Sequence, residues 1–267
     1  MDAKAPSIGS LLRDWRQRRR LSQLDLAVEA EVSQRHLSFL EAGRSMPSRE
    51  MVLKLAACLD VPLRQRNQML VAAGFAPNYA ERRLDDPRLQ PALDAVRQVL
   101  KGHEPNPAIA VDRAWTMIMA NDAIAPFLAA VADPALLAPP VNVLRLALHP
   151  DGMASRIENL DQWRHHLLER LRQQIDATAD PVIAELEAEL SAYPAPRRSG
   201  APRFDPAAAA VAVPLRIRMP DATLSFISTI TVFGTPLDVT LSEVAVESFF
   251  AADEQTAAYL RTAARKA

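Results

Sequence analysis

Two short apolar patterns with helical spacing lie close together near the N-terminus, between residues 21 and 45. Ser22 opens the first and Ser33 the second, and a serine at such a position can accept a hydrogen bond from a free amide of the first helical turn. Leu21 and Val32 precede these serines, at the outer position of a hydrophobic staple. The pattern therefore predicts two consecutive helices joined by a tight corner.

The apolar and polar positions of this stretch also predict which sides of the helices are buried. We expect one shared core from Leu24, Ala27, Val28, Val32, Leu37 and Leu40. The first turn of the second helix is polar instead, with Gln34, Arg35, His36 and Ser38. A polar first turn on a helix that is otherwise packed is what reading base edges in the DNA major groove requires.

A longer pattern runs through the same stretch: Leu-Ser-Gln, then Ser-Gln after a corner, then Glu-x-Gly-Arg. Its members are Leu21, Ser22, Gln23, Ser33, Gln34, Glu41, Gly43 and Arg44. This arrangement resembles the helix-turn-helix of the lambda-repressor-like, or XRE, family. The resemblance implies base contacts from the second helix and phosphate contacts around it. The residues that we predict to bind double-stranded DNA are Gln23, Ser33, Gln34, Arg35, His36, Ser38, Phe39 and Arg44.

One residue at the corner departs from that family. Glu31 stands where the family usually has glycine, and a non-glycine residue held at positive φ costs on the order of 1 kcal/mol. Either the corner is slightly strained or its geometry differs. An ordinary helical hairpin without DNA contacts is the structural alternative.

Three further helical patterns complete the N-terminal part. We expect helices over residues 7–20, 48–60 and 62–74, which gives an all-α, five-helix, lambda-repressor-like domain. The first of them carries five arginines that we expect at the surface, some of them on phosphate. These arginines are Arg13, Arg16, Arg18, Arg19 and Arg20.

The pattern changes to strict alternation after residue 107. Residues 108–121 predict two short strands with a turn at 112–114, and residues 210–218, 223–233 and 237–250 predict three more, the last two around a turn at 234–236. Between the two groups of strands, helices are predicted at 155–177 and after Asp180. A further helix is predicted at the C-terminus. The whole chain is therefore of α+β class, with a five-stranded antiparallel sheet in its second half.

Several short motifs in this half resemble the ligand-binding domain of MmyB-like transcription regulators, a PAS-like module. They are Asp112-Arg113, the run from Trp115 to Asn121, Asn142-Val143-Leu144-Arg145, His149-Pro150, Trp163 before Leu167 and Leu171, and the strand pair from Thr229 to Val246. The predicted domains are 1–80 for DNA binding, 81–107 as a linker with one helix, and 108–267 as the PAS-like MmyB-type domain. A proline-rich stretch at 194–206 departs from the family pattern.

The second resemblance implies an apolar small-molecule ligand, with a fatty acid as the leading class, in a cavity between sheet and helices. Methionine and aromatic side chains suit such a cavity. The predicted ligand-binding residues are Trp115, Met117, Met119, Phe127, Trp163, Phe226, Ile230 and Phe233, with Arg145 for a carboxylate. The plainer alternative is that the apolar ones are simply core. The cationic partner could also be Arg113, His149, Arg216 or Arg218.

Composition and charge add two expectations. The chain of 267 residues has a net charge of −1. Residues 1–80 hold 12 Lys and Arg against 8 Asp and Glu, whereas residues 81–267 hold 19 against 24. An excess of four positive charges is modest, so we expect DNA affinity to depend on a homodimer that doubles the phosphate contacts. A single cysteine, Cys58, excludes an intrachain disulfide and a multi-cysteine metal site.

Other classes of function find little support in the residues. His149, His165 and His166 lack the spacing of a metal site, and no glycine-rich loop could hold a phosphate, so we expect no metal, no cofactor and no enzyme. No apolar run reaches the ~18 residues of a membrane span, so we expect a cytoplasmic protein. The alternative function is a DNA-binding regulator whose C-terminal domain only dimerises or docks a protein partner.

Overall fold

The structure is a computed structural model, and it describes residues 6–194, 213–233 and 238–265. The chain divides into two compact units. The first comprises residues 1–83, 176–179 and 235–242, and the second comprises residues 84–175, 180–234 and 243–267. In the described part of the chain, no helix is both long enough and apolar enough to cross a membrane.

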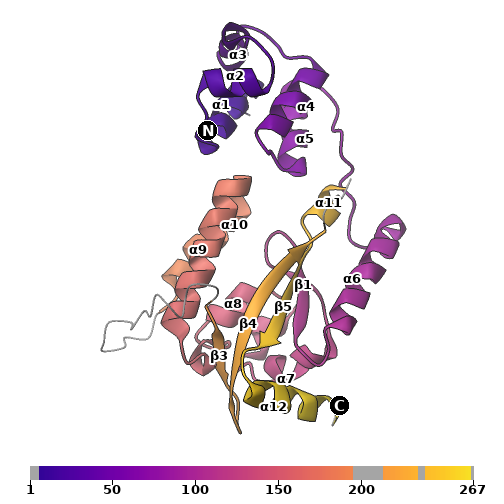
Figure 1. Ribbon diagram of the computed structural model, residues 1–267, viewed down its shortest axis with the longest axis vertical. Helices are drawn as coiled ribbons and strands as arrows, with labels where there is room; N and C mark the ends of the chain where they lie inside the picture. Colours follow the sequence, from indigo (N-terminus) through magenta and orange to yellow (C-terminus); the bar gives the residue numbers. More distant parts are fainter. Residues whose placement is uncertain (1–5, 195–212, 234–237, 266–267) are drawn as a thin grey trace. The chain divides into compact units, whose positions relative to one another are not determined.

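Residues 8–72 form the five predicted helices (Figure 1). These are α1 (Ile8–Arg18), α2 (Gln23–Glu29), α3 (Gln34–Glu41), α4 (Arg49–Cys58) and α5 (Leu63–Ala72). The side chains of Ser22, Ser33 and Ser48 each accept a hydrogen bond from a backbone amide three residues on. In α2 the bond is reciprocal, since the Ser22 amide donates to the Asp25 carboxylate at 2.9 Å. The predicted helix starts are confirmed, and local side chains explain them.

The buried face of α2 differs from our prediction. Leu24 and Val28 are 54% and 70% exposed, while Leu26 and Ala30 are fully buried and Ala27 almost so. Positions 24 and 28 form one helical stripe and positions 26 and 30 another, and both stripes are apolar. Periodicity alone could not choose between them, and packing against the neighbouring helices selects the stripe of Leu26.

Two backbone features determine how closely the helices of the first unit can pack and turn. Glu31 has φ +50°, so the corner keeps the left-handed conformation and carries a strain on the order of 1 kcal/mol. Gly9 lies against the end of α3, where a β-carbon on it would come within 2.5 Å of the Leu40 carbonyl oxygen. The two helices therefore approach more closely than any side chain at position 9 would allow.

Within the described residues, the second unit contains five strands in one antiparallel sheet with the order β2-β1-β5-β4-β3. They are β1 (Ala108–Val111), β2 (Met117–Ala120), β3 (Leu215–Arg218), β4 (Thr223–Val232) and β5 (Ala245–Ala251). The predicted strand pairing and the α+β class are confirmed. The predicted turn at 234–236 and the first residues of the predicted strand 210–218 lie outside the described residues.

The last strand is shorter than predicted. Residues 238–242 turn into α11 (Val239–Ser242), and β5 begins only at Ala245. The Asp238 carboxylate accepts hydrogen bonds from the amides of Thr240 and Leu241. Such a local side-chain bond competes with strand pairing, which explains the difference.

The two faces of the sheet are covered by different helices. On one face, Ala108 and Ala110 of β1 pack against Val96 and Leu100 of α6 (Gln90–Gly102). The alternate residues of β1, Ile109 and Val111, join the main core on the other face. Figure 1 shows α6 on one side of the strands and α9 on the other. The helix that we expected in a linker is thus a covering layer of the sheet.

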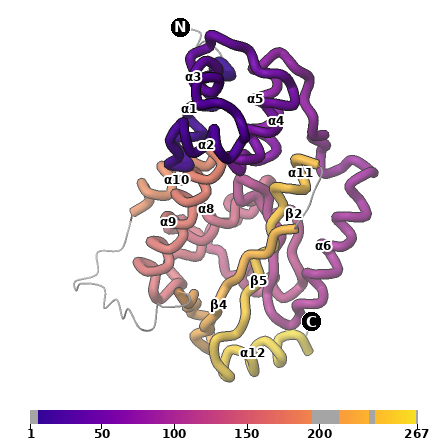
Figure 2. The backbone as a smooth tube through the Cα atoms, turned by 45° about the horizontal axis from the view of Figure 1, so that its top comes forward, coloured from indigo at the N-terminus to yellow at the C-terminus, as the bar shows by residue number. Residues whose placement is uncertain are grey.

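The main core lies between the second face of the sheet and a group of helices. These are α7 (Ala125–Leu128), α8 (Val143–Leu148), α9 (Leu160–Thr178) and α10 (Pro181–Ala192), with short 3-10 turns at Asp122–Ile124, Pro134–Leu137 and Ala154–Arg156. A further 3-10 turn, Pro87–Leu89, directly precedes α6 and contacts it. The C-terminal α12 (Glu254–Ala264) packs against β4 and β5, and Figure 2 shows it across their lower ends. The Ser225 amide donates to the Thr256 hydroxyl at 2.9 Å and ties α12 to β4.

Candidate nucleic-acid interface and ligand pocket

The first turn of α3 presents polar side chains at the surface. Ser33 caps the helix, with its hydroxyl accepting from the His36 amide at 3.1 Å. Ser33, Gln34 and Arg35 are exposed, and His36 and Ser38 are half-buried. The buried side of the same helix is supplied by Leu37 and Leu40. A rigid, packed helix therefore holds these hydrogen-bonding groups outward.

An aromatic ring and two arginines extend this surface. The guanidinium carbon of Arg35 lies 5.4 Å from the ring centroid of Phe39, and that of Arg44 lies 6.0 Å from it. Arg44 follows α3, and its amide donates to the Phe39 carbonyl at 2.9 Å. Gly43 permits this turn because its φ is +69°. The arrangement places two cations close to one apolar ring, next to the polar turn.

Gln23 has a different setting from the other predicted DNA-binding residues. Its side-chain amide donates to Oε2 of Glu41 at 2.9 Å, and Glu41 is only 4% exposed. The guanidinium of Arg16 donates hydrogen bonds to both oxygens of the same carboxylate, at 2.6 and 2.9 Å. Glu41 thus joins α1, α2 and α3 through one buried carboxylate.

The charge of Glu41 is maintained by these partners. Burial by itself would raise the pKa of the Glu41 carboxyl, but the hydrogen bonds from Arg16 and Gln23 and the positive charge of Arg16 outweigh it, and the pKa is lowered. Charge-assisted, two-pronged contacts between arginine and carboxylate are among the strongest polar contacts in proteins.

The five arginines in α1 and directly after it divide into two groups, contrary to our prediction that all five are exposed. Arg16 is held by Glu41, and the guanidinium of Arg19 donates to the carbonyl oxygens of Leu59 and Asp60 at 2.8 and 2.9 Å. Arg13, Arg18 and Arg20 are exposed. Phosphate contacts from α1 are therefore expected from the exposed group.

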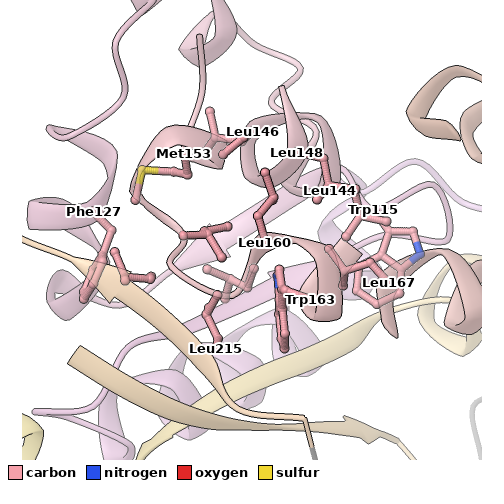
Figure 3. Packing of buried hydrophobic residues seen from close by; sticks show 14 of the residues in the cluster. Trp115, Phe127, Leu144, Leu146, Leu148, Met153, Leu160, Trp163, Leu167 and Leu215 are labelled. Atoms are coloured by element: carbon pink, nitrogen blue, oxygen red, sulfur yellow. The ribbon is translucent and has the colours of Figure 1, made fainter. Parts of the chain in front are cut away.

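A pocket lies in the core of the second unit, between the sheet and α7, α8 and α9. Its cavity volume is about 120 Å³. Figure 3 shows part of the core around it, with Trp163 between Phe127 and Trp115. The apolar lining residues are Pro107, Ile109, Met117, Ile124, Phe127, Leu128, Val143, Leu144, Leu146, Ala147, Met153, Ile157, Trp163, Leu167, Leu215, Ile217, Phe226 and Phe249. Two charged residues, Arg170 and Glu247, complete the wall.

Four of the predicted ligand-binding residues line this pocket: Met117, Phe127, Trp163 and Phe226. The other apolar ones lie elsewhere. Met119 and Phe233 pack against the cluster below α6, Ile230 is 40% exposed, and Trp115 belongs to the core without lining the pocket. The long β4 leaves the covered part of the sheet near its end, which explains the exposure of Ile230.

Arg145 also lies outside the pocket lining. Its Nε and Nη2 donate to the two carboxylate oxygens of Glu189, at 2.8 and 2.7 Å. That hydrogen bonding lowers the pKa of Glu189 and raises the pKa of Arg145. The side chain of Arg145 is 46% exposed. Arg145 therefore fastens α8 to α10 at the surface and is not placed to meet a ligand in the pocket.

Sequence reasoning missed the ion pair in the pocket wall. Nη1 of Arg170 donates to Oε1 of Glu247 at 3.1 Å, and the side chains are only 17% and 4% exposed. The Arg170 guanidinium also lies 4.3 Å from the ring centroid of Trp115. A signal was available, because Glu247 alternates with Ala245 and Phe249 on the inward face of β5. A charged residue in that phase of a strand predicts a buried partner.

Among the described residues, no group of three or more His, Cys, Asp or Glu side chains is placed to hold a metal ion. What the arrangement offers is recognition: a polar, cationic helix surface in one unit and a largely apolar pocket in the other.

Comparisons with known proteins agree with this division. Residues 12–65 match the helix-turn-helix family model. Residues 92–263 match the model described as MmyB-like transcription regulator ligand binding domain. A comparison with curated proteins finds no match. The second match covers more than half of the chain and follows a helix-turn-helix, so this protein belongs to the MmyB-like transcription regulators, with a DNA-binding domain before a ligand-binding domain.

Proposed function

We propose that this regulator binds operator DNA as a homodimer through α3, and that an aliphatic ligand of the fatty acid class in the pocket of the second unit alters that binding. The observation that carries the DNA part is the exposed turn of Gln34 and Arg35, with Phe39 and Arg44 beside it. Such a regulator works where the DNA is, so the cytoplasm remains its proposed location.

The roles follow from the chemistry of the side chains. Gln34 and Arg35 can each make two hydrogen bonds to a base edge in the major groove, the glutamine to adenine and the arginine to guanine. Phe39 offers an apolar face to a thymine methyl group. Arg44, Ser33 and His36 are proposed to hold phosphates, and two copies would read half-sites about 10 base pairs apart or a multiple of that.

Arg35→Ala is expected to lower operator affinity by about 1–3 kcal/mol and to relax the base preference at one position. The reason is that one bidentate contact to a base is lost. Selection of binding sites from a random duplex library, at one salt concentration, measures both effects.

Arg44→Ala is the matched control for this experiment. It removes an arginine beside the same Phe39 ring, but one that we assign to phosphate. It should weaken all sequences alike and reduce the slope of log affinity against log salt by about one unit per protomer. An unchanged base preference in Arg35→Ala would argue against this assignment of α3.

The ligand part rests on the pocket. A domain that only docks a protein partner needs no internal cavity, whereas here one is walled by methionine, leucine and aromatic side chains. A volume of about 120 Å³ is below the roughly 150 Å³ of a cavity that admits benzene. A longer aliphatic chain therefore requires wall side chains to move, and Met117 and Met153 are flexible enough to do so.

Native mass spectrometry of gently purified full-length protein tests this part. We expect an adduct of lipid-like mass on a fraction of the protein, and we expect its release by mild organic extraction. If preparations from several hosts carry no adduct and take up no added aliphatic acid or alcohol, the docking alternative is preferred.

A further inference from the structure

Arg170 in the pocket wall has hydrogen-bonding capacity that the protein does not use. Its Nη1 is bound to Glu247. Its Nε and Nη2 are buried and have no hydrogen-bond partner among the residues that the structure describes. A buried guanidinium donor without an acceptor is costly, and more so than a neutral donor in the same place. Such a pair of donors in a ligand pocket indicates the chemistry of the occupant.

The two atoms share one edge of the planar guanidinium, and that edge fits a carboxylate. Nε–H and Nη2–H point in parallel, at the spacing of two carboxylate oxygens. The same edge binds a carboxylate elsewhere in the described part of the chain, in Arg16 with Glu41, in Arg88 with Asp86 and in Arg145 with Glu189. In Arg170 this edge is left for a group from outside the protein.

The surroundings favour an anion with an apolar tail. The plane of the guanidinium is supported by Trp115, at 4.3 Å, so little rotamer freedom is lost on binding. Another lining residue of α9, Trp163, also has a buried nitrogen, Nε1, without a partner in the described part of the chain. All these unsatisfied groups are donors, and no unsatisfied buried acceptor among the described residues lines the pocket.

We propose that Arg170 is the specificity-determining residue of the pocket and that it binds the carboxylate of an aliphatic monocarboxylic acid through Nε and Nη2. Glu247 accepts a hydrogen bond from Nη1, the remaining nitrogen of the Arg170 guanidinium. Its negative charge compensates the positive charge of Arg170 while the protein has no ligand. The aliphatic chain lies among Met117, Phe127 and Phe226. This inference rests on the proposed ligand-binding function and adds the residue, and the edge of its guanidinium, that recognise the carboxylate.

The test is a calorimetric titration of the full-length protein with three probes of one chain length: decanoate, decan-1-ol and decylammonium. Protein whose native mass spectrum shows no adduct is used, below the concentration at which the probes form micelles. We expect decanoate to bind at least about tenfold more tightly than the alcohol, and the cation to bind most weakly. Arg170→Met should reduce decanoate affinity about 10- to 100-fold and alcohol affinity by less than about threefold.

Two further variants keep the result interpretable. Arg170→Met leaves Glu247 buried without its partner and could unfold the domain, so Arg170→Met combined with Glu247→Gln removes both charges together and should lose the same preference for decanoate. Arg145→Met is the matched control, since this arginine uses the same edge outside the pocket. It should leave decanoate affinity unchanged.

Each contrary result has a distinct meaning. Equal binding of alcohol and acid to the wild-type protein, or an acid preference that survives in both Arg170 variants, overturns the role of Arg170 but leaves an apolar ligand pocket. Preferred binding of decylammonium assigns charge recognition to Glu247 and overturns the proposal as well. If no probe binds at all, the proposed ligand-binding function fails with it.

Discussion

Glu41→Gln is expected to lower the free energy of unfolding of the DNA-binding unit by roughly 3 kcal/mol. The carboxylate side chain is fully buried, and that of its partner Arg16 is only 11% exposed. Removing one member of a buried ion pair leaves the other charge without compensation, which typically costs about 3–5 kcal/mol. Glutamine keeps one acceptor oxygen, so the lower end of that range applies.

Hydrogen–deuterium exchange of the full-length protein, read in peptides from residues 8–41, measures this effect where it occurs. The matched control is Glu31→Gln, the same change in an ion pair with Lys54, where the glutamate side chain is 82% exposed. Exposed pairs contribute about 0–1 kcal/mol, so protection should hardly change. Equal loss of protection in both variants would contradict the role given to the buried carboxylate.

The same carboxylate predicts how acid affects the unit. Because the folded protein lowers the pKa of Glu41, its contribution is complete above the ordinary glutamate value of about 4.3. It is lost as the pH falls through the lower pKa of the folded state. Glu41→Gln should therefore lose stability at neutral pH and lose part of the acid dependence below about pH 4.

Phe226→Ala is expected to destabilise the second unit by about 3–5 kcal/mol, the usual range for a phenylalanine removed from a core. Phe226 is 1% exposed and lies on β4 between Leu215 of β3 and Ala251 of β5. Its ring meets Phe127 and Phe249 edge to face, with centroids 5.7 and 6.4 Å away. The variant loses these contacts and leaves a cavity next to the pocket.

Ile227→Ala is the control for this variant, because the next residue on β4 faces the opposite way and is 40% exposed. It should cost less than about 1 kcal/mol. Urea unfolding of the full-length protein measures both, with peptides from β3, β4 and β5 followed by hydrogen exchange. If Phe226→Ala is no more harmful than Ile227→Ala, the ring does not have the central packing role that its contacts indicate.

Much of the fold could be predicted from the sequence because its signals are local. Ser22, Ser33 and Ser48 cap helices through bonds that span three residues. Strands can be predicted from the alternation of apolar and polar residues, as with the buried Leu224 and Phe226 of β4. The order of elements and the matched families followed from the same local patterns. Half of the predicted apolar ligand contacts also line the pocket: Met117 and Phe226 on strands, and Phe127 and Trp163 on helices.

Several of the errors share one origin, which is competition between surfaces that are equally apolar or equally charged. Leu24 and Leu26 are chemically alike, and so are Arg16 and Arg18. Leu26 is buried and Leu24 exposed because the neighbouring helices lie on one side of α2. Arg16 is bound and Arg18 exposed because Glu41 lies on one side of α1. Arg145 had a family motif around it, but Glu189 on α10 takes up its guanidinium.

The sequence by itself thus determined where elements begin, which class of fold they make, and which helix has a polar first turn, because those depend on bonds and spacings within a few residues. Only the tertiary structure decided which charged groups are buried. Arg170 and Glu247 are 77 residues apart in the chain, and the folding of α9 over β5 brings them together. Their pairing depends on the desolvation that packing imposes, and no local pattern contains it.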